Sequence, residues 1–306
     1  MRCNTPTADR RRRSPPQTAA NPAGADGQPG DLGPEAQADS LARYFSGEVL
    51  YGDDFDSGQI EAWYEDEREG YADLGARDRS RYHYAAHELN RQHVFRHLPA
   101  RRFPVCLGVG SAWGDELLPI ADRLDEVTIL DPSDAFHAER IGTAPVRYVK
   151  PDPSGVLPFD SDCFDLATCF GVLHHIPNVS LVVSELARVL RPGGVLALRE
   201  PMVSMGDWRQ PRRGLTRRER GIPRHLLERM AAEAGLAVLH RSRCTFPVTV
   251  ALYARLGREL FNSRWGTRLD RWASSAVAWN ERYHATTAWQ KLRPSVAVLV
   301  LAKPAS

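Results

Sequence analysis

The stretch that decides the fold is residues 157–194, LPFDSDCFDLATCFGVLHHIPNVSLVVSELARVLRPGG. It contains a β-rich apolar run at 164–170 and an amphipathic segment at 180–190, and it leads into a second apolar run at 194–199. Short β-rich runs that alternate with amphipathic helices are typical of βαβ units and a parallel sheet. The stretch therefore predicts the middle of an α/β domain.

Further strands are expected on both sides of this unit. They are predicted at 103–109, 127–131, 146–149, 236–241 and 295–302. Additional helices are expected after Gly114 and at 223–234, where Gly235 ends the helix. The chain is therefore expected to form a three-layer αβα fold around a sheet of seven strands.

The rest of the chain predicts additions to this core. Residues 1–39 have almost no large apolar side chains and are expected to be disordered. The expected organisation is this tail, a helical cap at 40–100, a core at 101–246 and 294–306, and a helical insertion at 247–293 before the last strand.

Composition excludes several kinds of protein. A formal net charge of +2 over 306 residues argues against nucleic-acid binding, which usually needs a strongly basic face. No apolar run approaches the roughly 18–20 residues of a membrane-spanning helix, and the arginines at 10–13 precede no secretion signal. The cysteines lack ligand spacing, so no metal is predicted. A cytoplasmic protein with small-molecule partners is expected.

A glycine-containing turn follows the strand at 103–109, in VCLGVGSAWGDE, residues 105–116. Such a turn presents backbone N–H groups and a helix N-terminus to an anionic group. Gly108, Gly110 and Gly114 would let the backbone approach a ligand closely. The turn alone also fits nicotinamide enzymes, or a helix that merely packs on a strand.

An acidic residue follows the next strand. Asp131 ends EVTILD and could accept hydrogen bonds from both hydroxyls of a ribose. The alternative is that Asp131 only caps the turn before Ser133. The glycine turn and Asp131 together predict a nucleotide-containing cofactor.

The LPF, FDL, VLHHIPN and VLRPGG segments resemble the class I S-adenosylmethionine-dependent methyltransferases of type 11 in order and spacing over roughly residues 100–200. The resemblance implies a Rossmann-like, mostly parallel sheet with an antiparallel final strand, and S-adenosylmethionine at the carboxyl ends of the strands. This chain departs from the family pattern in two places: Gly108 stands at a frequently acidic position, and Ala112 replaces a central glycine.

The resemblance also implies roles for individual residues. Asp131 would bind the ribose. Asp152 and Leu157 would lie near the adenine, although Asp152 is about one residue from the usual acidic position. The methionine part would be held by Gly108, Gly110, Ser111, Gly114, Cys169, Phe170 and Gly171.

Two other classes remain open. A nicotinamide-dependent oxidoreductase would use Gly108, Gly110 and Gly114, but Trp113 occupies the place of the third glycine of GxGxxG. A non-catalytic cofactor-binding or scaffold protein would keep the fold without turnover. Binding of S-adenosylmethionine without methyl transfer would distinguish this second class.

Histidines are the candidate general bases. His174 and His175 follow the strand at 164–170, and imidazole titrates near neutral pH. His87 is a second candidate, because Tyr84, His87 and Arg91 recur at helical spacing and could face one substrate pocket. The alternatives are a packing turn for the histidine pair and an ordinary surface role for His87.

An arginine-rich loop follows the strand at 194–199. Guanidinium groups of Arg199, Arg209, Arg212 and Arg213 could bind a phosphate or carboxylate of the acceptor. A solvated loop is the alternative. The segments REPMVSMGDWR and RRERGIP also resemble bacterial enzymes associated with surface-polysaccharide synthesis, which implies a sugar, sugar nucleotide or lipid-linked saccharide as acceptor. The methyl group is expected to go to oxygen rather than to nitrogen or carbon.

Trp265, Trp272 and Trp279 fall seven residues apart in the expected insertion. This spacing favours core packing or a seam against another subunit. Arginines at 264, 268 and 271 flank the stripe, so a helix in peripheral contact with a membrane is the alternative.

Overall fold

The computed structural model describes residues 41–208, 210, 212 and 214–305. The expected disordered tail lies outside these residues. A helical segment at 41–46 precedes the longer helices. These are α2 (Ser57–Glu67), α3 (His87–His93), α4 (Val179–Val189), α5 (Arg224–Glu233), α6 (Pro247–Arg255) and α7 (Arg264–Ala276).

One mixed sheet runs through the molecule in the order β3-β4-β2-β1-β5-β6-β8-β7. Its strands are β1 (Phe103–Val109), β2 (Leu124–Leu130), β3 (Arg140–Ile141), β4 (Ala144–Val149), β5 (Phe164–Phe170), β6 (Leu190–Pro201), β7 (Ala237–Cys244) and β8 (Val296–Ala302). The five central strands β4, β2, β1, β5 and β6 are parallel. The final strand, β8, is antiparallel to both of its neighbours, as expected.

The expectation of seven strands is wrong by one. All seven expected strands form, and β3 adds an eighth by pairing Arg140 with Pro145 and Ile141 with Ala144. A strand of two residues is too short to produce an alternating pattern, so the sequence does not predict it.

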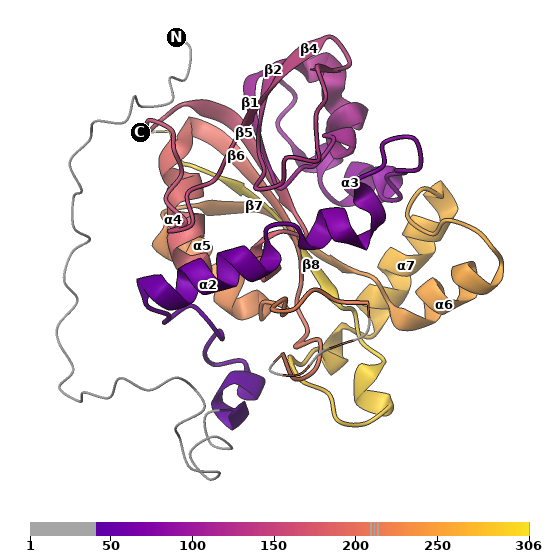
Figure 1. The fold of residues 1–306 in the computed structure, drawn as a ribbon. Coiled ribbons are helices and arrows are strands. Elements are labelled where there is room, and N and C mark those ends of the chain that lie inside the picture. The colour runs from indigo at the N-terminus through magenta and orange to yellow at the C-terminus, as the bar shows by residue number, and fades with distance from the viewer. Residues whose placement is uncertain (1–40, 209, 211, 213, 306) are drawn as a thin grey trace.

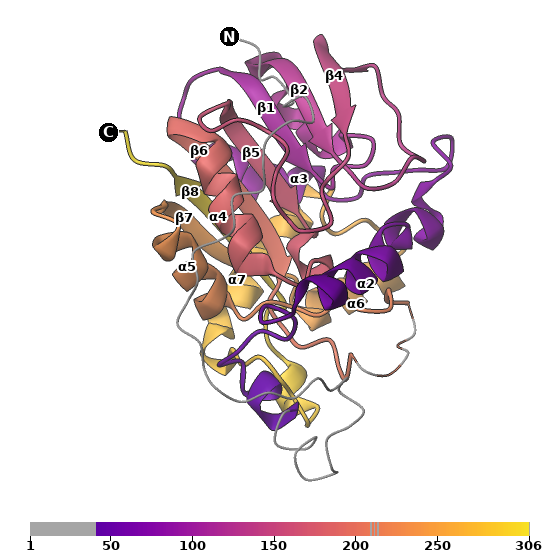
Figure 2. The ribbon, with the colours of Figure 1, turned by 60° about the vertical axis from the view of Figure 1, so that its left-hand side comes forward.

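Helices cover both faces of the sheet. Alternate residues of β6 point to opposite sides: Leu196 and Leu198 join one hydrophobic cluster, and Val195 and Ala197 join another. Figures 1 and 2 show α4 and α5 on one face and α3 and α7 on the other, with α2 crossing one end of the sheet. This position places α2 over the end of the sheet at which β5 finishes.

The predicted helices at 180–190 and 223–234 form as α4 and α5. The helix expected after Gly114 is a 3₁₀ helix at Asp115–Arg123 with Pro119 inside it. Proline lacks an N–H and crowds the preceding turn, so a regular α-helix is disfavoured there. The division into cap, core and insertion remains a prediction.

The tryptophan stripe lies in solvent, so core packing within the chain is the wrong interpretation. Trp265 and Trp272 are each 73% exposed and Trp279 is 69% exposed. The buried side of α7 is made of smaller residues, among them Asp270, which accepts the N–H groups of Thr245 and Phe246. Within the described residues, no helix combines the length and apolar character needed to span a bilayer.

Candidate active site

The turn after β1 has the tight geometry expected of a ligand-binding loop. Gly110 has a left-handed φ of 58°, and a Cβ at this position would lie 2.5 Å from Val172. Ala112, which replaces the glycine of the family pattern, has a φ of 47°. That region costs an L-residue about 1–2 kcal/mol. The alanine therefore keeps the left-handed backbone of the turn at an energetic cost.

Asp131 connects this turn to the end of β2. One carboxylate oxygen accepts the N–H of Ala112 at 3.1 Å and the other accepts the N–H of Ser133 at 3.0 Å. The expected cap on the Ser133 turn is therefore present, but it uses only part of the carboxylate, because each oxygen has two lone pairs. Burial raises the pKa of Asp131 to about 6, although both backbone hydrogen bonds oppose the shift.

Two adjoining cavities open at the carboxyl ends of β1, β2 and β5. The larger has a volume of about 420 Å³ and the smaller about 120 Å³. Both are lined by Gly110, Val172 and His175. The predicted site residues on the larger cavity are Tyr84, Gly110, Ser111, Asp131, Phe170, Gly171, His174, His175 and Arg199. Asp152 and Leu157 line the smaller one.

Three predicted cofactor residues pack beside these cavities without lining them. A Cβ at Gly108 would lie 2.4 Å from the Ser111 hydroxyl, and one at Gly114 would lie 2.4 Å from Ile141. These two glycines therefore permit close packing around the turn. Cys169 is fully buried in β5, with its Sγ 3.9 Å from a carboxylate oxygen of Glu200.

The expected grouping of Tyr84, His87 and Arg91 on one helical face is wrong. Helix α3 begins only at His87, so Tyr84 precedes it. Tyr84 accepts a hydrogen bond from Arg199 at 3.3 Å, and both side chains line the larger cavity. Arg91 is exposed and pairs with Glu88, and His87 packs its ring against Tyr84 without lining the cavity.

The arginine-rich loop contributes less than expected. Arg209 and Arg213 lie outside the described residues. Arg212 does not line either cavity, and its guanidinium donates to the carbonyl oxygens of Met205 and Thr216. Arg217 and Arg218 pair with Asp66. Arg212, Arg217 and Arg218 therefore hold the loop itself in place, whereas Arg199, near the end of β6, reaches the larger cavity.

Glu116 is a cavity residue that the sequence analysis missed. It is buried, it lines the larger cavity, and burial raises its pKa to about 7. The signal that could have found it is its place in the first turn of the helix that follows the glycine turn, where a side chain lies close to a bound ligand.

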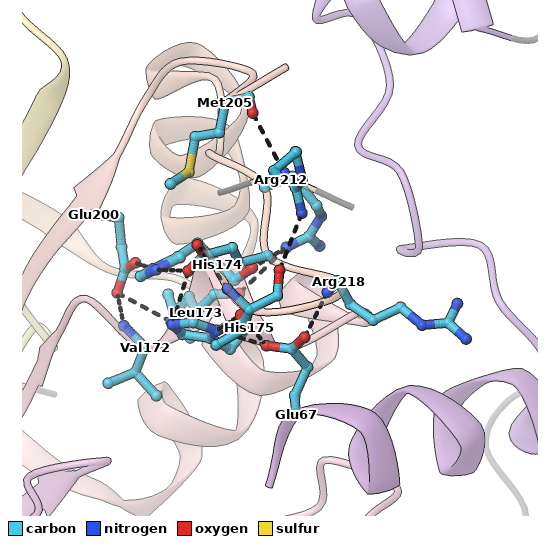
Figure 3. Close-up of polar contacts among 12 residues, drawn as sticks. Glu67, Val172, Leu173, His174, His175, Glu200, Met205, Arg212 and Arg218 are labelled. Atoms are coloured by element: carbon cyan, nitrogen blue, oxygen red, sulfur yellow. Dashed lines mark hydrogen bonds and ion pairs between the residues drawn. The ribbon is translucent and has the colours of Figure 1, made fainter. Parts of the chain in front are cut away.

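A cluster of histidines and glutamates lies beside the larger cavity, and Figure 3 shows polar contacts within it. His174 and His175 lie on a 3₁₀ turn directly after β5. His174 Nδ1 lies 2.9 Å from Glu200, and His175 Nδ1 lies 2.8 Å from Glu67. Both Nε2 atoms approach Oε2 of Glu219, at 3.5 Å from His174 and 3.4 Å from His175.

The cluster is fixed by buried polar contacts. Glu200, fully buried on β6, also accepts the N–H groups of Val172 and Leu173 at 2.9 and 3.1 Å. Arg220, also fully buried, donates to the carbonyl oxygens of His174, Ile176 and Pro177 at 3.1, 2.9 and 2.9 Å. The loop that carries both histidines is therefore tied down on two sides.

Burial and the neighbouring glutamates act in opposite directions on the pKa values of the two histidines. Burial alone would lower the pKa of His174, but hydrogen bonds to Glu200 and Glu219 outweigh it and raise the pKa to about 8. For His175, burial and the charge of His174 lower the pKa despite Glu67 and Glu219. Burial acts to raise the pKa of Glu219, but the two imidazoles reverse this effect and lower it.

The chemistry of this region can now be compared with known proteins. Residues 106–198 match the sequence model of a family described as a methyltransferase domain. This segment is therefore similar to a methyltransferase domain. Its cofactor is S-adenosylmethionine. The matched residues include the carboxyl half of β1, all of β2 and β5, and most of β6, and the carboxyl ends of these strands surround the cavities.

Two curated relatives match stretches of this chain that are similar in length to the methyltransferase match. Malonyl-[acyl-carrier protein] O-methyltransferase of Enterobacter lignolyticus (strain SCF1) is 38% identical over 120 residues, 38% of this chain and 47% of that protein. Sterol 4-C-methyltransferase strm-1 of Caenorhabditis elegans is 33% identical over 96 residues, 29% of this chain and 28% of that protein. The chain thus spans less than half the length of either relative.

A solved structure, of an S-adenosylmethionine-dependent methyltransferase from Mesorhizobium loti, covers 67% of this chain and 93% of its own, with 15% identity and a TM-score of 0.44. A likeness at that level carries no information on the acceptor of the methyltransferase domain.

Proposed function

We propose that this chain is an S-adenosylmethionine-dependent methyltransferase that methylates a hydroxyl oxygen of a small, glycan-type acceptor. The observation that carries the proposal is that the glycine turn, Asp131 and the His174–His175 pair line two adjoining cavities in a segment that matches a methyltransferase domain. The name of the 38% identical relative gives oxygen as its acceptor atom, which supports oxygen here.

The residues around the cavities fit the cofactor. The hydroxyl of Ser111 is buried, lines the larger cavity and interacts with the carboxylate of Glu116, so both polar groups lie where a ligand could contact them. Asp131 would bind the ribose. The smaller cavity has apolar walls that include Leu130, Leu157 and Val172, which suit an adenine ring. Glu116 would offer a carboxylate to the methionine ammonium group, in place of the acid absent at Gly108.

The charges on the larger cavity favour an acceptor without a strong negative charge. Its lining includes the carboxylates of Glu67, Glu116, Asp131 and Glu219, and the guanidinium groups of Arg68 and Arg199. An anionic acceptor is expected only if the arginines after β6 point into the cavity. Arg212 instead donates to backbone carbonyl oxygens. Carboxylates accept hydrogen bonds from hydroxyl groups, so an uncharged sugar fits this lining better than a phosphorylated one.

The cofactor supplies a methyl group already activated on a sulfonium, so the protein mainly has to align the acceptor and remove its proton. Tyr84 and Arg199, joined by a hydrogen bond, would orient acceptor hydroxyls. The group of His174, His175 and Glu219 would lie beside the reacting hydroxyl and promote loss of its proton. His87 is a weaker candidate for this role because it does not line the cavity.

The test is transfer of labelled methyl from S-adenosylmethionine. The purified chain would be incubated with an extract of its source cells, separated afterwards into metabolite, glycolipid and protein fractions, with Asp131→Ala as the matched inactive control. Label in a sugar or glycolipid fraction, absent from the control, is the expected result. Label only in protein or in non-sugar metabolites would refute the glycan acceptor. Tight binding of S-adenosylhomocysteine without label in any fraction would favour a non-catalytic binder.

A further inference from the structure

We propose that His174, His175 and Glu219 form a binding site for a divalent transition-metal ion in the wall of the larger cavity. The ligand atoms that these three side chains can offer all lie within 4.8 Å of one another. Ligands about 2.0–2.1 Å from a zinc ion at tetrahedral angles are roughly 3.3 Å apart. The two contacts of 3.4 and 3.5 Å between the Nε2 atoms and Glu219 Oε2 already match that spacing.

The contacts of the second ring nitrogen of each histidine support a metal site. Histidines that bind a metal usually place their other ring nitrogen against a carboxylate or carbonyl oxygen, which fixes the ring and raises its basicity. Here both rings do so: Nδ1 of His174 lies against Glu200 and Nδ1 of His175 lies against Glu67. Both Nε2 atoms are thereby directed toward Glu219.

The charge of the cluster also favours a cation. Glu67, Glu200 and Glu219 are all buried, and two imidazoles lie among them. The nearby guanidinium groups are directed elsewhere: Arg218 pairs with Asp66, and Arg220 donates to backbone carbonyls. Buried carboxylates are costly unless they are paired or coordinate a metal. A divalent ion would compensate this concentration of negative charge.

The ligand types indicate the class of metal. Imidazole nitrogen suits zinc, iron, nickel and copper, and a set of two histidines and one carboxylate leaves coordination positions open. All three side chains line the cavity, so the open positions would face it. The spacing rules applied to the cysteines could not detect this set, because Glu219 is separated from the histidines by more than forty positions in the chain.

The role of the ion rests on the proposed function. A cation beside the acceptor would stabilise the negative charge that develops on its hydroxyl oxygen. The oxygen would lose its proton to solvent and form the new carbon–oxygen bond. The methyl–sulfur bond would break with its electron pair remaining on sulfur, which gives S-adenosylhomocysteine. The metal would not change its oxidation state, so no oxidant or reductant is needed.

The test is titration of the full chain, freed of metal by a chelator, with Co²⁺ followed by visible absorbance and with Zn²⁺ followed by calorimetry. One ion per chain is expected. Glu219→Gln and His175→Ala should weaken binding at least tenfold. Glu67→Gln, which leaves all three ligands in place but changes the group against Nδ1 of His175, should weaken it about 10- to 100-fold. His225→Ala and Glu233→Gln, both on exposed positions of α5, are matched controls that should bind as wild type.

Circular dichroism would verify that each variant is folded. The proposal is overturned if folded wild-type protein takes up no ion, or if Glu219→Gln and His175→Ala bind Co²⁺ as wild type does. Binding of S-adenosylhomocysteine and methyl transfer, measured in the same samples, separate the proposed metal site from the proposed methyltransferase function. Cofactor binding and methyl transfer that persist in chelator would refute the metal and leave the proposed function intact. Stoichiometric Co²⁺ binding without any methyl transfer would support the site and count against the proposed function.

Discussion

Asp131 is the residue on which cofactor binding should depend most. Its two oxygens hold the backbone of Ala112 and Ser133 and still have free lone pairs toward the cavity. Asp131→Ala should weaken binding of S-adenosylhomocysteine about 10- to 100-fold, because hydrogen bonds to a charged group contribute roughly 1.5–3 kcal/mol. Isothermal titration calorimetry would measure the change.

A control for this variant is available on the same strand. Asp125 lies at the other end of β2, where it is exposed and pairs with Arg102. Asp125→Ala should leave cofactor affinity unchanged. Equal affinities for Asp131→Ala and wild type would show that the ribose site has been assigned to the wrong residue.

The raised pKa of Asp131 predicts a pH dependence of binding. The carboxylate form accepts hydrogen bonds from ribose hydroxyls, and burial raises the pKa of this group to about 6. Affinity for S-adenosylhomocysteine should therefore decrease as the pH falls through about 6. Titrations at a series of pH values would measure the midpoint. Asp131→Asn, which cannot ionise, should remove this step, and a step that persists in that variant would contradict the assignment.

Glu116 should add a second step near neutral pH. Its pKa is raised to about 7 by burial, and its carboxylate form is the one that would attract the methionine ammonium group. Affinity should therefore decrease as the pH falls through about 7. Glu116→Gln should abolish that component and leave the step near 6 in place. The same calorimetric series would separate the two residues.

The element that positions the histidines is the loop after β5, and Arg220 is its main anchor. This guanidinium is fully buried and donates to five backbone carbonyls, including those of Tyr51 and His174. Arg220→Ala would leave these acceptors buried without partners, so the free energy of unfolding should fall by about 3 kcal/mol or more. Urea unfolding would measure the loss.

Lysine keeps the positive charge but lacks the planar fork of donors, so Arg220→Lys should recover only part of this stability. Arg229→Ala, at an exposed position of α5, should change the free energy of unfolding by less than about 0.5 kcal/mol. An Arg220→Ala protein as stable as wild type would mean that water or a rearranged loop satisfies the carbonyls.

Among the helices and strands, those with a clear short-range sequence pattern were predicted correctly. The seven expected strands and the helices α4 and α5 have clear apolar periodicity, and all of them form. The start of α3 was mispredicted because it depends on a distant contact: the side chain of Asn262 accepts the N–H of His87. Periodicity along α3 contains no information about that partner.

For the candidate site, too, the sequence predicted the residues of local motifs and missed those that only tertiary packing brings together. Gly110 and Asp131 stand at strand ends within one recognisable motif, so their positions on the cavity followed from the sequence. Glu67, Glu200 and Glu219 reach the histidines from α2, from β6 and from the loop after β6. Only the packing of these three segments brings them together, and a single sequence does not reveal that packing.

For the molecule as a whole, the exposed tryptophans of α7 are the clearest departure from the expected pattern. Because Trp265 and Trp272 are 73% exposed, replacing either with alanine should change the free energy of unfolding by less than about 0.5 kcal/mol. Trp63 is fully buried, and Trp63→Ala should cost about 3–5 kcal/mol. Urea unfolding followed by circular dichroism would compare them. A large loss at Trp265 or Trp272 would mean that this face is covered in solution.

The uneven burial of the tryptophans also has an optical consequence. Four of the seven indoles, at positions 265, 272, 279 and 289, are exposed and open to a water-soluble quencher, whereas Trp63, Trp113 and Trp208 are shielded. Trp63 donates to the carbonyl oxygen of His175, and Trp113 lies within the glycine turn, directly before Gly114. Intrinsic fluorescence therefore contains two separable signals. The emission that iodide removes reports on the surface of α7 and of the segment that follows it, and the emission that survives reports on the interior around the histidine loop and the glycine turn.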